Sequence, residues 1–403
     1  MEQVKIRNEK FQFFLLIYIV AITGFMSFFG LGKAIYLLTP IVLYKTWKEH
    51  KYVPSDVFRA VILMFVLFFI QNLYHQGTWT VAVTQSIRML TLALCAVWVI
   101  KDFRILFPLL IYYISVWSLV FWIGCMISSG FQNTLISIAH YLPELRTEEF
   151  LQYSSNPSES IYVYTINTAN SIRNSGPFWE PGMFTVFITM ALAINLFNGL
   201  SLFNMRNIIL LLANISTFST TGYVATLILL AFYVFIGKKV AIWKLLFLLC
   251  IPLVIWQVMS LDFMQEKIMD QMAQTDVSYS RFGALFYHLE KIKLAPLIGY
   301  GVNEWPTTTM DIMMSSGHVS PNGISIIAVI WGIPLALGYF YLLYKSLAII
   351  FYERKMIVKI AVFIVVLTLL FSQDVTNRDF FYLLIFLGII SLSQKEYAKC
   401  IVK

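Results

Sequence analysis

The sequence predicts an all-α, polytopic integral membrane protein with about twelve transmembrane helices. Hydrophobic residues make up 59% of the 403 residues and charged residues only 12%, and the mean hydropathy is +0.76. A soluble domain usually has about a quarter of its residues charged. So few charged side chains do not cover a water-exposed surface, and we expect lipid to be the main solvent. The apolar residues also occur in long runs, and about 20 of them cross ~30 Å of hydrocarbon as a helix.

These apolar runs define the predicted transmembrane segments. They lie at 11–29, 31–47, 57–74, 81–100, 104–128, 182–199, 207–220, 221–237, 240–259, 323–344, 356–373 and 379–393. Most of the 29 lysines and arginines fall on one side of the membrane if the amino terminus is inside. The positive-inside rule therefore predicts that both termini are cytoplasmic. It also explains the net charge of +8 without a nucleic-acid partner.

Two connections, both on the outer side, are too long for ordinary loops. The chain is thus divided into amino-terminal helices, a first large outer loop, central helices, a second large outer loop and carboxy-terminal helices, at 1–128, 129–181, 182–259, 260–322 and 323–403. Both loops carry aromatic and apolar residues, so we expect them to be folded.

The second outer loop contains two predicted helices. The stretch "LDFMQEKIMDQMAQ" has apolar residues at helical spacing and predicts an amphipathic helix at 261–275 that covers the bundle. The next helix, "SRFGALFYHLEKIKL", places Arg281 and His288 on one face. Its predicted apolar stripe is Phe282, Leu285, Phe286, Leu289 and Ile292. In "APLIGYGVN", Gly299 and Gly301 allow either a tight turn or close approach to a ligand.

The first outer loop ends in "SIRNSGPFWEPG", directly before an apolar run. Its Gly-Pro and Pro-Gly pairs interrupt any helix between Arg173 and Glu180, so both charges lie on irregular backbone. Such backbone at membrane depth is tolerated only where protein or a water-filled cavity surrounds it. Pro181 suits the first turn of the next helix. Glu180 either caps that helix, complements its dipole, or serves chemistry.

Three arginines, Arg173, Arg281 and Arg378, come from separate outer segments, against the positive-inside bias. Each either pairs with a loop acid such as Glu180 or Asp374, or contributes its planar fork to an anion site. The cysteines Cys95, Cys125, Cys250 and Cys400 are scattered, and no metal or nucleotide motif is present. We therefore expect no metal and no cofactor.

Several stretches occur in an order that resembles a known family: "RNSGPFWEPG", "STFSTTGYV", "SRFGALF", "APLIGYGVN" and "SPNGISIIAVIWGIP". They resemble the bacterial O-antigen polymerase and O-antigen ligase superfamily, the Wzy-like membrane enzymes. The resemblance implies a metal-independent glycosyltransferase of the helical, GT-C-like class in the bacterial inner membrane, with its active site on the extracytoplasmic face. Its substrates would be undecaprenyl-pyrophosphate-linked glycans, for O-antigen, capsule or exopolysaccharide. Its protein partners would be a flippase and a chain-length regulator.

The family's ligases have His-Asn, nine residues and then Gly in the last of these motifs. Asn322 and Gly332 keep that spacing, but Pro321 occupies the histidine position and the nearest histidine is His318. This difference favours a polymerase over a ligase. A lipid-linked oligosaccharide flippase remains the alternative from another class, although the few charges within spans do not favour it.

The resemblance assigns roles to particular residues. Arg173 and Arg281 would neutralise the departing pyrophosphate, with Arg378 as a third clamp or sugar binder. Glu180 and His318 are the candidate bases for the acceptor hydroxyl, and Asp374 is a weaker candidate. His318 is equally compatible with an ordinary loop histidine. The predicted substrate-binding residues are Arg378, Asn322, Trp179, Tyr300 and Asn303. The aromatic residues among these are also typical of a membrane-interface belt. We interpret the hydroxyl-rich "STFSTTGY" as helix packing.

Overall fold

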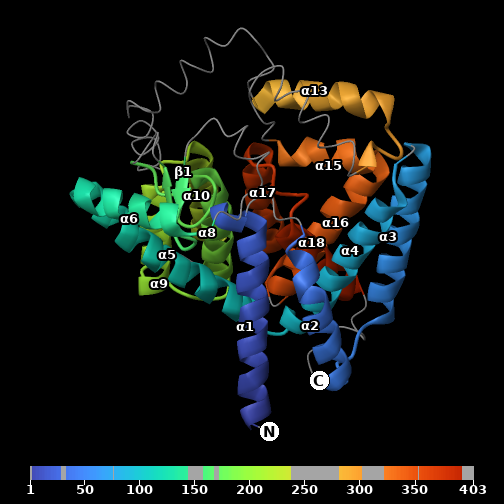
Figure 1. Cartoon of the computed structure of the whole chain (residues 1–403), viewed down its shortest axis with the longest axis horizontal. Coiled ribbons are helices and arrows are strands. Elements are labelled where there is room, and N and C mark those ends of the chain that lie inside the picture. The colour runs from blue at the N-terminus through green and yellow to red at the C-terminus, as the bar shows by residue number, and fades with distance from the viewer. Residues whose placement is uncertain are drawn as a thin grey trace.

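The chain folds as a bundle of helices, which confirms the predicted all-α class (Figure 1). The computed structural model describes residues 2–28, 33–75, 77–143, 158–167, 172–236, 281–301, 322–352 and 354–392. In these ranges the strands form one antiparallel hairpin of β1 (Ser158–Ser160) and β2 (Thr165–Asn167). The predicted segments 240–259 and 261–275 lie outside the described residues.

Four helices of the described chain are long and apolar enough to cross a membrane, judged by length and composition. They are α3 (Ser55–Tyr74), α4 (Trp79–Val99), α5 (Phe103–Ile127) and α16 (Ile333–Ile350). Five shorter apolar helices pack with them: α8 (Pro181–Phe197), α9 (Met205–Ser216), α10 (Thr220–Ile236), α17 (Met356–Ser372) and α18 (Asp379–Leu392). A 12-residue helix such as α9 measures about 18 Å, which is less than the hydrocarbon thickness. About twelve full-length spans are therefore not confirmed by the described helices.

The amino-terminal part adds α1 (Glu2–Gly24), a short 3-10 turn at Met26–Phe28 and α2 (Ile35–Lys48). The predicted first outer loop contains α6 (Ser129–Tyr141) and the β-hairpin. The Ser128 side chain caps α6 by accepting a hydrogen bond from the Phe131 amide at 3.1 Å. This part of the loop is folded, as expected.

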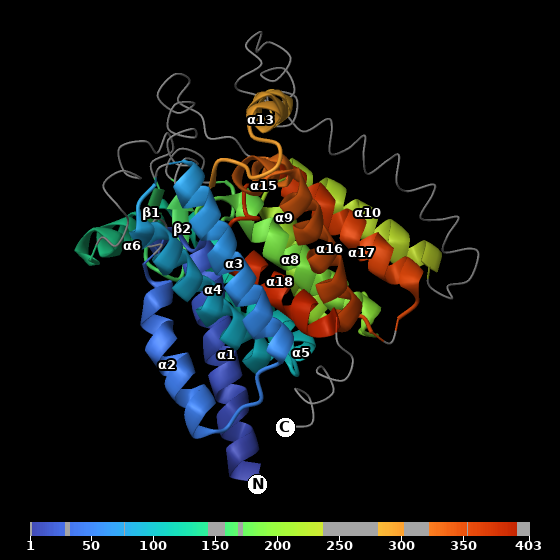
Figure 2. The same ribbon diagram turned by 90° about the vertical axis from the view of Figure 1, so that its right-hand side faces the viewer.

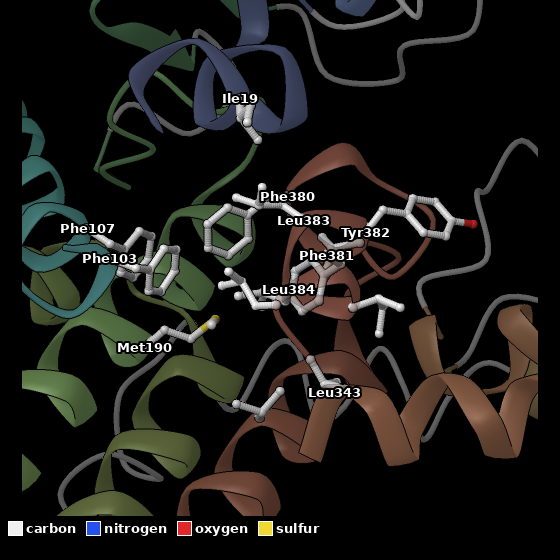
Figure 3. Close-up of a cluster of buried hydrophobic side chains, with 14 of the residues drawn as sticks. Ile19, Phe103, Phe107, Met190, Leu343, Phe380, Phe381, Tyr382, Leu383 and Leu384 are labelled. Carbon is white, nitrogen blue, oxygen red and sulfur yellow. The ribbon is translucent and has the colours of Figure 1, made fainter. Parts of the chain in front are cut away.

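Helix α18 lies at the centre of the hydrophobic core (Figure 3). Its Phe380 ring packs against Phe107 of α5, with ring centroids 5.1 Å apart, and against Phe187 of α8 at 5.0 Å. Figure 3 also shows Ile19 of α1 and Leu343 of α16 around the same cluster. Every residue of α8 is buried. The core therefore holds the amino ends of α8 and α18 in fixed positions.

The predicted single span 323–344 is wrong, because the chain breaks at Gly332 into α15 (Gly323–Trp331) and α16. Gly332 has φ 77° and ψ 166°, a conformation that side chains with a Cβ rarely adopt. Pro334 follows at the start of α16 and supplies no amide donor. Helix α15 therefore lies across one end of the bundle instead of continuing α16.

Helix α13 (Arg281–Leu294) lies over α15 at this same end, which we call the α15 end of the bundle (Figures 1 and 2). Its predicted apolar stripe is only partly right. Phe286 and Leu289 are exposed, whereas His288 and Ile292 are buried. The Nδ1 atom of His288 lies 2.7 Å from Ser325 Oγ of α15, and this hydrogen bond allows the polar side to face the bundle.

Candidate functional site

A short turn, Gln373–Arg378, joins α17 to α18 at the α15 end of the bundle. Its conformation is set by backbone hydrogen bonds from Val375 N to Gln373 O and from Arg378 N to Val375 O, both 3.0 Å long. The Thr376 hydroxyl donates to Gly323 O at 2.7 Å, and the Tyr339 hydroxyl donates to Thr376 O at 2.7 Å. The turn is thereby attached to both α15 and α16.

The amino ends of four helices converge on this turn. Helix α18 begins directly after it, and α15 begins at Gly323, where the turn is bonded. Helix α8 approaches so closely that a Cβ on Gly182 would clash with the Gln373 side chain. Helix α10 is joined through Thr221 Oγ1, which lies 2.6 Å from Ser372 Oγ. Helix amino ends carry partial positive charge, so their convergence favours an anion.

The stretch "GPFWEPG" places Trp179 and Glu180 beside the turn. Met26 N donates to Pro177 O at 2.8 Å and Trp179 N donates to Gly24 O at 3.2 Å, so this non-helical backbone is attached to the end of α1. Phe178 is fully buried and stacks on Phe184 and Phe187. The segment is therefore irregular but firmly anchored, as the Gly-Pro and Pro-Gly pairs predicted.

One cluster of charged and aromatic side chains lies at the turn. Its members are Arg378, Trp179, Glu180 and Asp374. The Arg378 guanidinium carbon lies 5.3 Å from the centroid of the Trp179 ring, within cation–π range. Asp374 interacts electrostatically with both Arg378 and Glu180. Burial raises the pKa of the Asp374 carboxyl, Arg378 opposes that shift and Glu180 adds to it, and the resulting pKa is about 6.

Glu180 is the residue before α8, but its side chain makes no capping hydrogen bond. The capping interpretation of Glu180 is therefore wrong, while Pro181 does occupy the first turn of α8 as predicted. Glu180 has an extended backbone, with φ −149° and ψ 155°, and this conformation directs the chain into α8. The negative charge of the Glu180 carboxylate instead raises the pKa of Asp374.

Arg88 of α4 and Asp379 of α18 form a buried ion pair next to the turn, with Arg88 Nε 2.6 Å from Asp379 Oδ1. Arg88 also donates to Asn377 O at 3.0 Å and to Gln85 Oε1 at 3.3 Å. The Tyr382 hydroxyl donates to Asn377 Oδ1 at 2.7 Å. Sequence reasoning missed this pair, although an arginine inside an apolar run was a signal that a buried partner was needed.

Arg173 lies where α9 ends and α10 begins. Its Nε donates to Thr217 O at 3.3 Å, and α9 stops there because Phe218 takes a positive φ of 48°. The neighbouring Asn174 donates to Ser216 Oγ at 2.9 Å and to Ser118 Oγ at 3.3 Å. The stretch "STFSTTGY", interpreted as packing, thus also positions Arg173.

Asn322, predicted to bind substrate, caps α15. Its Oδ1 accepts hydrogen bonds from Ile324 N at 3.1 Å and from Ser325 N at 3.2 Å. Its Nδ2 is buried and has no hydrogen-bond partner within the described chain. Asn322 therefore has a structural role at the amino end of α15, beside the turn.

Tyr300, also predicted to bind substrate, packs at the end of α3. Its ring stacks on His75 with centroids 5.9 Å apart, and its amide donates to Val329 O at 2.8 Å. A Cβ on Gly299 would lie 2.5 Å from Gly332 N, so this glycine permits close approach to the α15–α16 break. The contacts that the structure describes for Tyr300 join it to α3, α13 and α15 and not to Arg378.

The remaining predicted residues cannot be placed in the same way. His318 and Asn303 lie outside the described residues. Arg281 begins α13, and its side chain lies outside the described part of the structure. His288, on the same helix, has its pKa lowered by burial to about 4, so it is neutral at physiological pH.

Comparisons with protein-family models, with curated proteins and with solved structures found no match for this chain.

Proposed function

We propose that this protein is a membrane-embedded polymerase of undecaprenyl-pyrophosphate-linked oligosaccharide repeat units. It transfers the growing glycan from one lipid carrier to the sugar of another at the outer leaflet of a bacterial inner membrane. The proposal follows the family that the sequence resembles, and its polymerase assignment follows Pro321 in place of the ligase histidine.

A membrane location is supported by the surface of the long helices. Large apolar side chains are strongly exposed on several helices, including Leu37, Ile62, Leu63, Trp117 and Leu337. Large exposed apolar patches are rare on soluble monomers. Lipid is the solvent in which such side chains cost no free energy.

The observation that carries the proposal is the convergence of four helix amino ends on the turn that bears Arg378. A diphosphate leaving group gains negative charge as its bond to the anomeric carbon breaks. Preoriented positive groups stabilise that charge without reorganising at the moment of reaction. Arg378 and the helix dipoles provide such groups, and Arg173 lies on the segment that leads to Trp179 and Glu180.

The arrangement favours a transferase over a flippase. A flippase needs polar groups along a path through the membrane. In the described helices, the buried pair Arg88–Asp379 is bonded to the turn at one end of the bundle, together with Asp374 and Arg378. Within the described helices the buried charge thus lies at one end, where a reaction at a single leaflet would occur.

Deletion of the gene and electrophoresis of the surface glycan test the proposal. A single repeat unit left on the acceptor is the result expected for a polymerase. Free lipid-linked polymer with nothing attached would identify a ligase instead, and single units retained at the cytoplasmic face would identify a flippase.

Two substitutions then connect the function to the site. Arg378→Ala and Arg173→Ala should each reduce polymer by about 100-fold or more, because both arginines are proposed to stabilise the departing pyrophosphate. Arg206→Ala is the matched control, since Arg206 is exposed at the start of α9. Long polymer made at the normal amount by both variants, with normal protein abundance in the membrane, would contradict the assignment of this site.

A further inference from the structure

We propose that Asp374 is the catalytic base that takes the proton from the acceptor sugar hydroxyl. This inference rests on the proposed function and names a residue that sequence reasoning had placed behind Glu180 and His318.

Asp374 lies in the turn on which the four helix amino ends converge. Gln373, the residue before it, packs against Gly182 of α8, and Thr376, two residues after it, is bonded to α15. The carboxylate is therefore held on backbone that is fixed on both sides. The Asp374 carboxylate therefore lies beside the proposed diphosphate site, whereas Arg378 supplies the positive charge for that site.

The titratable groups around Asp374 come from three parts of the chain. Arg378 belongs to the same turn, Glu180 to the segment before α8, and Tyr382 to α18. Arg88 of α4 and Asp379 of α18 act on Arg378. Asp374 thus has a nearby cation that favours its ionised form and a second carboxylate that opposes its ionisation.

Two other groups near this end already have partners. The Asp379 carboxylate accepts a hydrogen bond from Arg88 at 2.6 Å. His288 is bonded to Ser325 and has a pKa of about 4. Asp374, with a pKa of about 6, is ionised at neutral pH and still basic enough to accept a proton.

The O–H bond of the acceptor hydroxyl breaks and its proton moves to a carboxylate oxygen of Asp374. The acceptor oxygen forms a bond to the anomeric carbon of the donor glycan. The bond between that carbon and the pyrophosphate oxygen breaks, and its electron pair leaves with undecaprenyl pyrophosphate. Asp374 then returns its proton to solvent.

The test uses the purified full-length protein in lipid nanodiscs, with the lipid-linked repeat unit isolated from cells that lack the protein. Asp374→Asn should lower kcat by about 10²–10⁴-fold. It should bind undecaprenyl pyrophosphate at least as tightly as the wild type, because it removes a negative charge from an anion site. Asp56→Asn, at an exposed pair with Arg59, is the matched control and should keep the wild-type rate.

The pH profile supplies a readout that a purely structural role would not change. Since the base must be ionised, wild-type kcat/KM should fall as the pH drops below about 6. Asp374→Glu should move that acid limb. If Asp374→Asn does not accumulate as folded protein, the pH profiles of the wild type and Asp374→Glu still test whether Asp374 is the base.

The outcomes separate the two proposals. Wild-type protein that extends the glycan, together with an Asp374→Asn variant of equal rate or an acid limb unmoved by Asp374→Glu, would overturn the role of Asp374 alone. Wild-type protein that binds undecaprenyl pyrophosphate but never extends the glycan would overturn the proposed function, and the role of Asp374 with it.

Discussion

Arg88 and Asp379 lie 2.6 Å apart in the interior, with side chains 13% and 9% exposed. An arginine buried among apolar helices is costly unless its donors are used. Here the guanidinium bonds Asp379, Asn377 O and Gln85, and it lies 5.2 Å from the Tyr382 ring centroid. The pair therefore holds the beginning of α18, and with it the turn that carries Asp374 and Arg378.

We predict that Arg88→Met destabilises the protein by about 3–5 kcal/mol, because it leaves the Asp379 carboxylate buried without its partner. The double variant Arg88→Met/Asp379→Asn removes both charges and should recover much of that loss. Denaturant titration in detergent micelles measures both free energies of unfolding. A double variant as unstable as the sum of the two single variants would show that the pair is not coupled.

The break between α15 and α16 determines how the α15 end of the bundle is built. Gly332 is in a conformation with φ 77°, and a Cβ at this position would clash with Leu297 O. Ile333 N donates to Pro296 O at 2.8 Å, and Gln71 Nε2 donates to both Ile298 O and Ile330 O. The segment after α13 is thus attached to the break, and α13 is kept over α15.

Gly332→Ala should destabilise the protein by about 1–3 kcal/mol from backbone strain, with a further steric cost. Gly338→Ala is the matched control, because a Cβ at Gly338, within α16, meets nothing within 4 Å. In a helix interior alanine is favoured over glycine by about 0.5–1 kcal/mol, so the control should be neutral or stabilising. Thermal unfolding of both variants in detergent distinguishes these effects, and equal midpoints would contradict the proposed strain at Gly332.

The whole bundle has an amphiphilic organisation that suits a membrane. The apolar side chains exposed along α3 and α5 lie on its flanks, while the candidate site lies at the α15 end. Helix α1 begins at the opposite end of the bundle in Figure 1. With the amino terminus inside, as the lysines and arginines predict, we expect the α15 end to face the outside of the cell.

Cysteine labelling tests this orientation. In a variant without the native cysteines, Ile172→Cys should react with a membrane-impermeant maleimide in intact cells, because residue 172 precedes Arg173 at the outer side. Phe203→Cys, between α8 and α9, should react only after the cells are opened. Both native side chains are exposed, 52% and 76%, so accessibility is matched. The reverse pattern would place the candidate site in the cytoplasm and contradict the proposed function.

Local sequence was sufficient to locate most of the helices. The runs predicted at 57–74, 356–373 and 379–393 correspond to α3, α17 and α18 within two residues. Their ends depend on charges, prolines and polar residues that lie next to the runs. The non-helical "GPFWEPG" segment was predictable for the same reason, since Gly and Pro act on their own backbone.

The composition of the candidate site depended on packing between distant segments. Glu180, Asp374 and Arg378 meet because α8, α10, α15 and α18 pack around one turn, and no local pattern specifies which helix ends become neighbours. The same reason explains why Asp374 ranked behind Glu180 in sequence reasoning, and why the Arg88–Asp379 pair and the burial of His288 were missed. Hydrophobic run length is a property of the chain, whereas burial and charge partners are properties of the packed bundle.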